Sequence, residues 1–98
     1  MNGFSVDNPP PAGPFDQDPR LQRILNAKQG PGPWPNAVLH RLHPPVPVTV
    51  RVVWKEDGVE YLDTTATGWG GLHVLVTIFD RRRRFSFVWL HCDDVGRR

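Results

Sequence analysis

Cysteine is nearly absent from this sequence, since Cys92 is its single copy. One cysteine cannot form an internal disulfide, and it excludes the cysteine-rich zinc sites that hold many small domains together. No apolar run approaches the ~18 residues that a membrane-spanning helix needs. Residues 1–6 lack the basic and apolar regions of a signal peptide. We therefore expect a cytoplasmic protein, without membrane contact, whose fold depends on packing alone.

Proline is absent from the second half of the chain, because all 11 prolines lie between Pro9 and Pro47. Proline cannot donate to a β ladder and is confined to edges, strand starts and bulges. The change in composition therefore predicts a proline-rich arm over residues 1–46 and a small β domain over residues 47–98. Such a domain is near the lower size limit for a single core, so we expect the arm or a second chain to cover part of it.

The arm contains one segment with the signals of a short helix, near residues 19–29. Asp18 is a good N-cap, Pro19 suits the first helical position, and Gly30 suits the C-cap. The apolar stripe of this helix consists of Leu21, Ile24 and Leu25. A helix this short is marginal alone. We therefore expect the stripe, with Trp34, to bury against the β domain or a partner.

From Pro47 onward the apolar residues follow a period of two, which is typical of strands. Four strands are predicted near 47–55, 59–67, 72–79 and 84–91, with a hairpin turn at Asp57-Gly58. The last two carry apolar residues on both faces, so the sheet must curl or be covered. The predicted fold is a four-stranded antiparallel meander or a small SH3-like barrel.

The predicted core contains one alternating set from each apolar strand: Val50, Val52, Trp54, Val74, Val76, Phe87 and Trp89. The aromatic residues could instead form a platform for stacking bases, but a core this small needs large side chains. Trp69 lies between glycines in a predicted bend and should be the most exposed of Trp54, Trp69 and Trp89. We therefore include it among the candidate partner-binding residues, with Leu21, Ile24, Leu25 and Trp34.

Residues 50–98 resemble a pattern in small uncharacterised SH3-like β-barrel proteins of actinobacteria and their phages. The pattern includes Arg51-Val52-Val53-Trp54, the turn at Asp57-Gly58, Glu60-Tyr61-Leu62, Ala66 and Trp69, then Val88-Trp89-Leu90, Asp94-Val95 and terminal arginines. The resemblance implies an SH3-like fold and a bacterial or phage origin. It implies no activity and no functional residues.

Catalytic and metal-binding residues are not expected. His91 and Cys92 are adjacent in a strand, so their side chains point to opposite faces unless the strand has ended. The pair His40 and His43 resembles half a metal site, but Pro44-Pro45 stiffens the segment. The glycines at 68–71 lack the following helix of a phosphate-binding loop. We predict no enzyme, no cofactor and no small-molecule substrate.

Two functions remain open from the sequence. The first is an interaction module, with a possible phage structural or host-interaction role, that binds another protein or its own copies through the arm and the barrel edge. The alternative is nucleic-acid binding through Arg81, Arg82, Arg83 and Arg84 at a hairpin tip, where replacement by serine should leave the fold intact. The 12 basic and 10 acidic residues give a net charge of only +2, so the whole-chain field does not favour nucleic acid. The arginine run could also be a solvated turn or meet an acidic protein.

Overall fold

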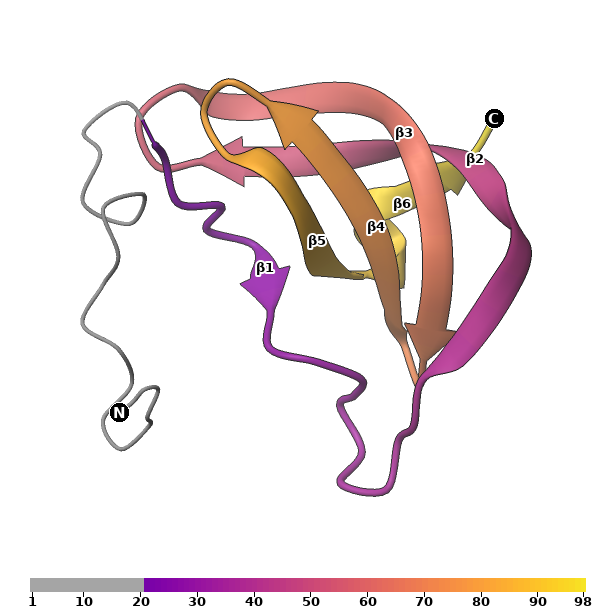
Figure 1. Cartoon of the computed structure of the whole chain (residues 1–98). Helices are drawn as coiled ribbons and strands as arrows, with labels where there is room; N and C mark the ends of the chain where they lie inside the picture. The colour runs from indigo at the N-terminus through magenta and orange to yellow at the C-terminus, as the bar shows by residue number, and fades with distance from the viewer. Residues whose placement is uncertain (1–20) are drawn as a thin grey trace, which may run out of the picture.

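Two long strands, β2 (His40–Trp54) and β3 (Gly58–Gly70), form the hairpin on which the fold is built (Figure 1). They pair antiparallel without interruption from Val46 to the predicted turn at Asp57-Gly58. Gly58 has a φ of 77°, a conformation that glycine adopts without steric cost. The computed structural model describes residues 21–98, so residues 1–20 of the predicted arm lie outside the described residues.

Four further strands extend the sheet on both sides of this hairpin. β4 follows β3, β5 pairs with β4, and two short strands lie at the edges, β1 beside β5 and β6 beside β2. Every pair is antiparallel. The bounds are Ala27–Lys28 for β1, His73–Asp80 for β4, Arg84–His91 for β5 and Val95–Arg97 for β6, with a 3₁₀ turn, η1, at Cys92–Asp94.

The described chain is mainly β, as the sequence predicts. Its sheet has six strands rather than four, in the order β1-β5-β4-β3-β2-β6. Strands β2 to β5 neighbour one another in chain order, and β1 and β6 lie at opposite edges, so the sheet is open rather than closed into a barrel. Strong curvature of β2 and β3 encloses the core instead (Figure 1). Over residues 21–98, no helix has the length and apolarity needed to cross a bilayer.

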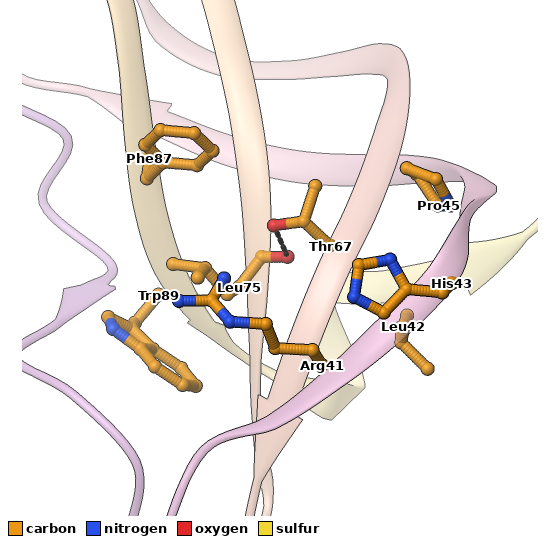
Figure 2. Close-up of a pocket in the computed structure, with 8 residues that line it drawn as sticks. All are labelled: Arg41, Leu42, His43, Pro45, Thr67, Leu75, Phe87 and Trp89. Carbon is orange, nitrogen blue, oxygen red and sulfur yellow. Dashed lines mark hydrogen bonds between the residues drawn. The ribbon is translucent and has the colours of Figure 1, made fainter.

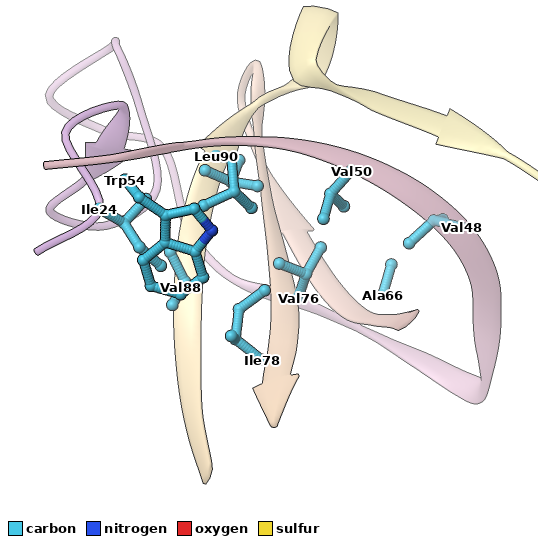
Figure 3. Packing of buried hydrophobic residues seen from close by; sticks show 10 residues of the cluster. Ile24, Val48, Val50, Trp54, Ala66, Val76, Ile78, Val88 and Leu90 are labelled. Atoms are coloured by element: carbon cyan, nitrogen blue, oxygen red, sulfur yellow. The ribbon is translucent and has the colours of Figure 1, made fainter. Parts of the chain in front are cut away.

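The core lies inside the bend of the sheet, where side chains of β2 face those of β4 and β5 (Figure 3). β2 contributes Val48, Val50, Val52 and Trp54, which follow the period of two in the sequence. The other buried members of this cluster are Ile24, Ala66, Val76, Ile78, Val88 and Leu90. The core therefore draws on the segment before β1 as well as on the long strands.

β5 turns the opposite face to the core from the one predicted. Val88 and Leu90 are 4% and 0% exposed, whereas Phe87 is 57% exposed and Trp89 is only half-buried. The register pairs Val88 with Val76 on the inner face. Both alternating sets of β5 are apolar, and a shift of one residue exchanges the two faces of a strand. The pattern within β5 could not choose between them. Val74, also predicted in the core, is half-buried.

The helix predicted near residues 19–29 is not present from residue 21 onward. Ile24 forms an isolated bridge with Trp54, and the backbone N–H of Leu25 donates to the carbonyl of Val53 at 2.7 Å. β1 then pairs with β5. An isolated short helix is marginal, so the capping signals are outweighed by these strand-like hydrogen bonds and by burial of Ile24.

β2 begins at His40, before the boundary near Val46 that the prolines suggest. Pro44 and Pro45 lie inside the strand, where a register shift interrupts its pairing with β3 between Arg41 and Val46. Because proline cannot donate to the ladder, it is tolerated at such an irregularity. The first part of β2 therefore forms an arch, in which it departs from regular pairing with β3 between Arg41 and Val46.

Residues 31–38 pack directly on the end of β3, at Gly70. A side chain at position 70 would place its Cβ 2.6 Å from Cβ of Pro31 and 2.7 Å from the carbonyl oxygen of Val38. The N–H of Gly32 donates to the carbonyl of Gly70 at 3.2 Å, and that of Leu72 donates to the carbonyl of Gly32 at 2.6 Å. This proline-rich stretch is thus attached to the sheet, which requires glycine at position 70.

Candidate functional site

Exposed aromatic side chains form a row on the outer side of β4 and β5, opposite the core. Phe79, Phe85 and Phe87 are 83%, 59% and 57% exposed. Phe79 and Phe85 are cross-strand partners with ring centroids 6.3 Å apart, and Phe87 meets Phe85 edge-on at 5.4 Å. Trp89 continues the row, because alternate residues of a strand share a face. Phe79, Phe85, Phe87 and Trp89 are termed the outer aromatic face below.

The outer aromatic face continues into a groove of about 510 Å³ (Figure 2). Leu75, Phe87 and Trp89 supply apolar surface, and the arch of β2 places its side chains across from them. The lining residues are Arg41, Leu42, His43, Pro45, Thr67, Leu75, Phe87 and Trp89. Thr67 donates its hydroxyl to the carbonyl of Leu75 at 3.4 Å. The groove thus combines aromatic and aliphatic surface with one arginine and one histidine.

Arg82, from the predicted arginine loop, forms a dense polar cluster under the β4–β5 turn. Its guanidinium donates to both carboxylate oxygens of Asp80 at 2.8 and 2.9 Å, to Asp57 at 3.0 Å and to Glu60 at 2.6 Å. It also lies 4.2 Å from the centroid of the buried Trp54 ring, whose N–H donates to Glu60 at 3.1 Å. The side chain of Arg82 is only 13% exposed. It therefore links the β2–β3 turn to the β4–β5 turn.

These contacts change the ionisation of the groups involved. Hydrogen bonding to Arg82 lowers the pKa of Asp80 from 3.8 to about 2. A hydrogen bond from Gln22, followed by that from Arg82, lowers the pKa of Asp57. The pKa of Arg82 is raised, mainly by its hydrogen bonds to Asp80. Each shift favours the charged form, so Asp57 and Asp80 stay ionised and compensate the charge of Arg82 at neutral pH.

The other arginines of the run do not share this position. Arg81 is exposed, Arg83 is half-buried, and Arg84 begins β5 with a φ of 59°. Beyond the run, arginines pair with carboxylates: Arg51 with Asp94 at 3.2 Å and Arg98 with Asp63 at 3.9 Å. Acidic groups therefore interleave with the arginines, which weakens any single positive surface for phosphates.

The residues predicted to contact a partner have different environments. Ile24 belongs to the chain's own core and is 7% exposed, so its side chain is not available to a partner. Leu21 is half-buried, and Leu25 and Trp34 are 54% and 51% exposed. Trp69 is 42% exposed and stacks on His40 with ring centroids 4.4 Å apart. None of them lines the groove.

His91, Cys92 and Asp93 place potential metal-ligand atoms within 4.8 Å of one another. Nδ1 of His91 already accepts the backbone N–H of Asp93 at 3.0 Å, as the N-cap of η1. Sγ of Cys92 is 3.9 Å from the same nitrogen. The lone pair that would bind a metal or accept a thiol proton is thus engaged in capping. Among the described residues, His40 and His43 are not part of this group.

Sequence reasoning missed the groove and placed half of the outer aromatic face in the core. A usable signal was the segregation of residue types, because odd positions of β4 and β5 carry Phe79, Phe85, Phe87 and Trp89 while the even positions carry Ile78, Val88 and Leu90. The aliphatic set matches the valines of β2 and packs against them. Arg41 and His43 could not be found in this way, since their position depends on the arch of β2.

Comparison of the chain with protein-family models, with curated proteins and with solved structures gave no match. The SH3-like resemblance of residues 50–98 therefore stays a prediction. The function therefore has to be inferred from the geometry of the chain itself. Two features stand out: the outer aromatic face with its groove, which is exposed, and the Arg82 cluster, which is largely buried.

Proposed function

We propose that this chain is a non-enzymatic module that binds another protein through its outer aromatic face. The observation that carries the proposal is the exposure of Phe79, Phe85 and Phe87 side by side on two paired strands. Contiguous apolar patches on small proteins usually mark interaction sites. Aromatic and arginine side chains also dominate the energy of protein interfaces, and the groove places Arg41 across from Trp89.

The edge strands β1 and β6 contain two and three residues, so each covers only part of the longer strand beside it. Among the described residues, β1 pairs with β5 only at Trp89 and Leu90, and unpaired edge backbone can accept an added strand. The outer face of β4 and β5 offers side chains in addition. An SH3-like character of the bent sheet and a phage structural or host-interaction role, both drawn from the resemblance, are compatible with a module of this kind.

Capture from a lysate of the source organism tests the proposal. The full chain is compared with a Phe85→Ser, Phe87→Ser variant and with a matched control, Val59→Ser, Tyr61→Ser. The control residues are 52% and 67% exposed, and Tyr61 lines a different pocket, beside Arg51 and Asp94. Each sample is run with and without nuclease treatment, and melting curves confirm that both variants fold.

We expect a specific protein to be captured by the parent and by the control, and to be lost with the phenylalanine variant. Removal of two aromatic contacts from the centre of an interface typically costs several kcal/mol, which is enough to abolish capture. Equal capture by the phenylalanine variant, or loss of all capture upon nuclease treatment, would contradict the proposal.

Self-association is the alternative use of the same face. Two copies packed through Phe79 and Phe85 would remove these rings from water, which is favourable at about 25 cal/mol per Å² of apolar surface. Sedimentation equilibrium of the parent and of the phenylalanine variant distinguishes the two uses. A dimer that the substitutions dissociate would assign the face to a second copy, whereas a monomeric parent leaves it to another protein.

A further inference from the structure

The groove lacks a counter-charge of its own. Arg41 and His43 stand on one side of it, Leu75, Phe87 and Trp89 supply the apolar surface, and none of its lining residues is acidic. No hydrogen bond or ion pair joins the side chain of Arg41 to another described residue. A complementary occupant would therefore combine rigid apolar groups with a carboxylate.

The described chain begins at the turn that joins β4 and β5, the two strands that carry this face. The backbone N–H of Gln22 donates to the carbonyl of Arg82 at 2.7 Å, and its side-chain amide donates to Asp57 at 3.0 Å. Residue 22 is thus held at the β4–β5 turn, which is flanked by the cross-strand pair Phe79 and Phe85. The point at which residues 1–20 join the described chain therefore lies near one end of the outer aromatic face.

The composition of this preceding segment matches the groove. It contains Pro9, Pro10, Pro11, Pro14, Phe15, Asp16 and Asp18. Proline-rich segments favour extended conformations that bind aromatic-lined grooves at low entropic cost. The neighbouring aspartates supply carboxylates of the kind that pair with arginine.

The length of the segment also matches the distance to be covered. The six residue steps from Asp16 to Gln22 would span about 19 Å in an extended conformation of 3.1 Å per residue. Along the start of β5, the five residue steps from Arg82 to Phe87 span about 17 Å at 3.3 Å per residue. Asp16 can therefore reach the level of Phe87, and the prolines before it can reach Trp89.

We propose that residues 9–18 bind in the groove of the same molecule. Pro14 and Phe15 contact the apolar surface at Leu75 and Trp89, and Asp16 pairs with Arg41. The proposal rests on the outer aromatic face being a binding surface, and it names the first ligand of that surface as a segment of this chain. A short tether gives an effective concentration of about 1 mM, so a protein partner has to displace the segment before it can bind.

Paramagnetic relaxation in the full chain tests this inference. Cys92→Ser removes the only cysteine, and Ala12→Cys then places a nitroxide label within the proline-rich segment. We expect loss of signal at the indole N–H of Trp89 and at the amides of Phe87 and Leu75. The amides of Val59 and Tyr61, on the other half of the sheet, should keep their intensity.

Three variants of the labelled chain examine the chemistry of the contact. Serine at positions 9, 10, 11 and 14 should restore the lost signals, and so should Arg41→Glu. Combining Arg41→Glu with Asp16→Lys should bring the loss back, because the ion pair is restored with reversed charges. Arg97→Glu, on the edge strand β6, serves as the matched control and should change nothing.

Each possible outcome decides the proposal. Full signal at Trp89 and Phe87 in the labelled chain would overturn it, even if capture from lysate depends on the outer aromatic face. Signal loss that appears only when labelled chains are mixed with unlabelled isotope-enriched chains would assign the segment to a second copy and also overturn it. Signal loss within one chain, with failure of capture, would support the intramolecular contact and refute the proposed partner.

Discussion

Arg81 and Arg82 are neighbours with the same side chain and opposite environments. The backbone N–H and Nε of Arg82 both donate to Oδ1 of Asp80, at 2.9 and 2.8 Å, which turns its guanidinium toward the ring of Trp54. Arg81 is exposed. A run of like residues at a hairpin tip is therefore not a patch of like function, because the turn geometry directs each side chain separately.

The ionisation of Asp80 predicts a loss of stability in acid. Its folded-state pKa is lowered from 3.8 to about 2 by Arg82. Since a lowered carboxylate pKa stabilises the fold above the unfolded-state value, this contribution is complete above about pH 4 and is lost as the pH falls toward 2. Chemical denaturation at a series of pH values should show the free energy of unfolding falling over this window.

Asp80→Asn is the variant that isolates this effect. It should be less stable than the parent at pH 7 by about 1.5–3 kcal/mol, the usual range for a hydrogen bond to a charged group, and its stability should depend less on pH between 4 and 2. Asp93→Asn, whose parent carboxylate is 87% exposed, is the control. An unchanged pH dependence in Asp80→Asn would contradict the role of the Arg82 cluster.

β5 shows how the pairing of a strand determines which of its two faces is buried. Its register against β4 places Val88 opposite Val76 and Phe87 opposite Thr77. The first pair faces the valines of β2 in the core, and the second lies outside. Because aliphatic and aromatic sets alternate along β5, either face could have been buried, and the fit to β2 selects the aliphatic one.

Two truncations in β5 test this assignment. Leu90→Ala should destabilise the chain by about 2–5 kcal/mol, the usual cost of a cavity in a core. Phe87→Ala should cost much less, because the ring is 57% exposed. Thermal or urea unfolding of the two variants gives the comparison. A larger loss for Phe87→Ala than for Leu90→Ala would mean that the aromatic face is the buried one.

Asn26 explains why the segment before β1 joins the sheet. Its side-chain oxygen accepts the backbone N–H of Val53 at 3.0 Å, and its side-chain N–H groups donate to the carbonyl of Arg51 at 2.9 Å and to Asp94 at 3.1 Å. The side-chain amide thus forms hydrogen bonds with the backbone of β2 like those that a neighbouring strand would form, and it also bonds to Asp94 of η1. These distant partners, rather than local helix signals, set the conformation around Ile24.

Over the whole molecule, charged groups of both signs are intermixed, whereas the exposed aromatic side chains are concentrated on one face. Carboxylates are distributed among the arginines, at Asp57, Glu60 and Asp80 around Arg82 and at Asp94 beside Arg51. The aromatic rings, by contrast, gather on the outer side of β4 and β5. This arrangement favours recognition of a protein surface over recognition of a phosphate backbone.

The arginine run still permits a direct test of nucleic-acid binding. Arg81, Arg83 and Arg84 are replaced by serine with Arg82 retained, and DNA affinity is measured over a series of salt concentrations. We expect weak affinity in the parent and little change in the variant. A steep salt dependence, with a log–log slope of about −0.9 per phosphate contacted, that the variant loses would instead assign the chain to nucleic acid.

Replacement of all four arginines is not a neutral control, contrary to the expectation from a hairpin tip. Arg82→Ser alone removes every hydrogen bond of the guanidinium to Asp57, Glu60 and Asp80. It should lower the melting temperature markedly, whereas the triple variant should melt close to the parent. Similar melting of Arg82→Ser and the triple variant would show that the cluster adds little to the fold.

The amino-acid sequence was sufficient for the β class, for the hairpin turn at Asp57-Gly58 and for the buried face of β2. Those features depend on the period of two and on an Asp-Gly turn, which are properties of contiguous residues. The tertiary structure alone decided the conformation of residues 21–29, the outward face of β5 and the burial of Arg82. Each of these depends on partners distant in the chain. A short helix is marginal in isolation, a strand that is apolar on both sides has no preferred face, and four identical arginines differ only in what the fold places beneath them.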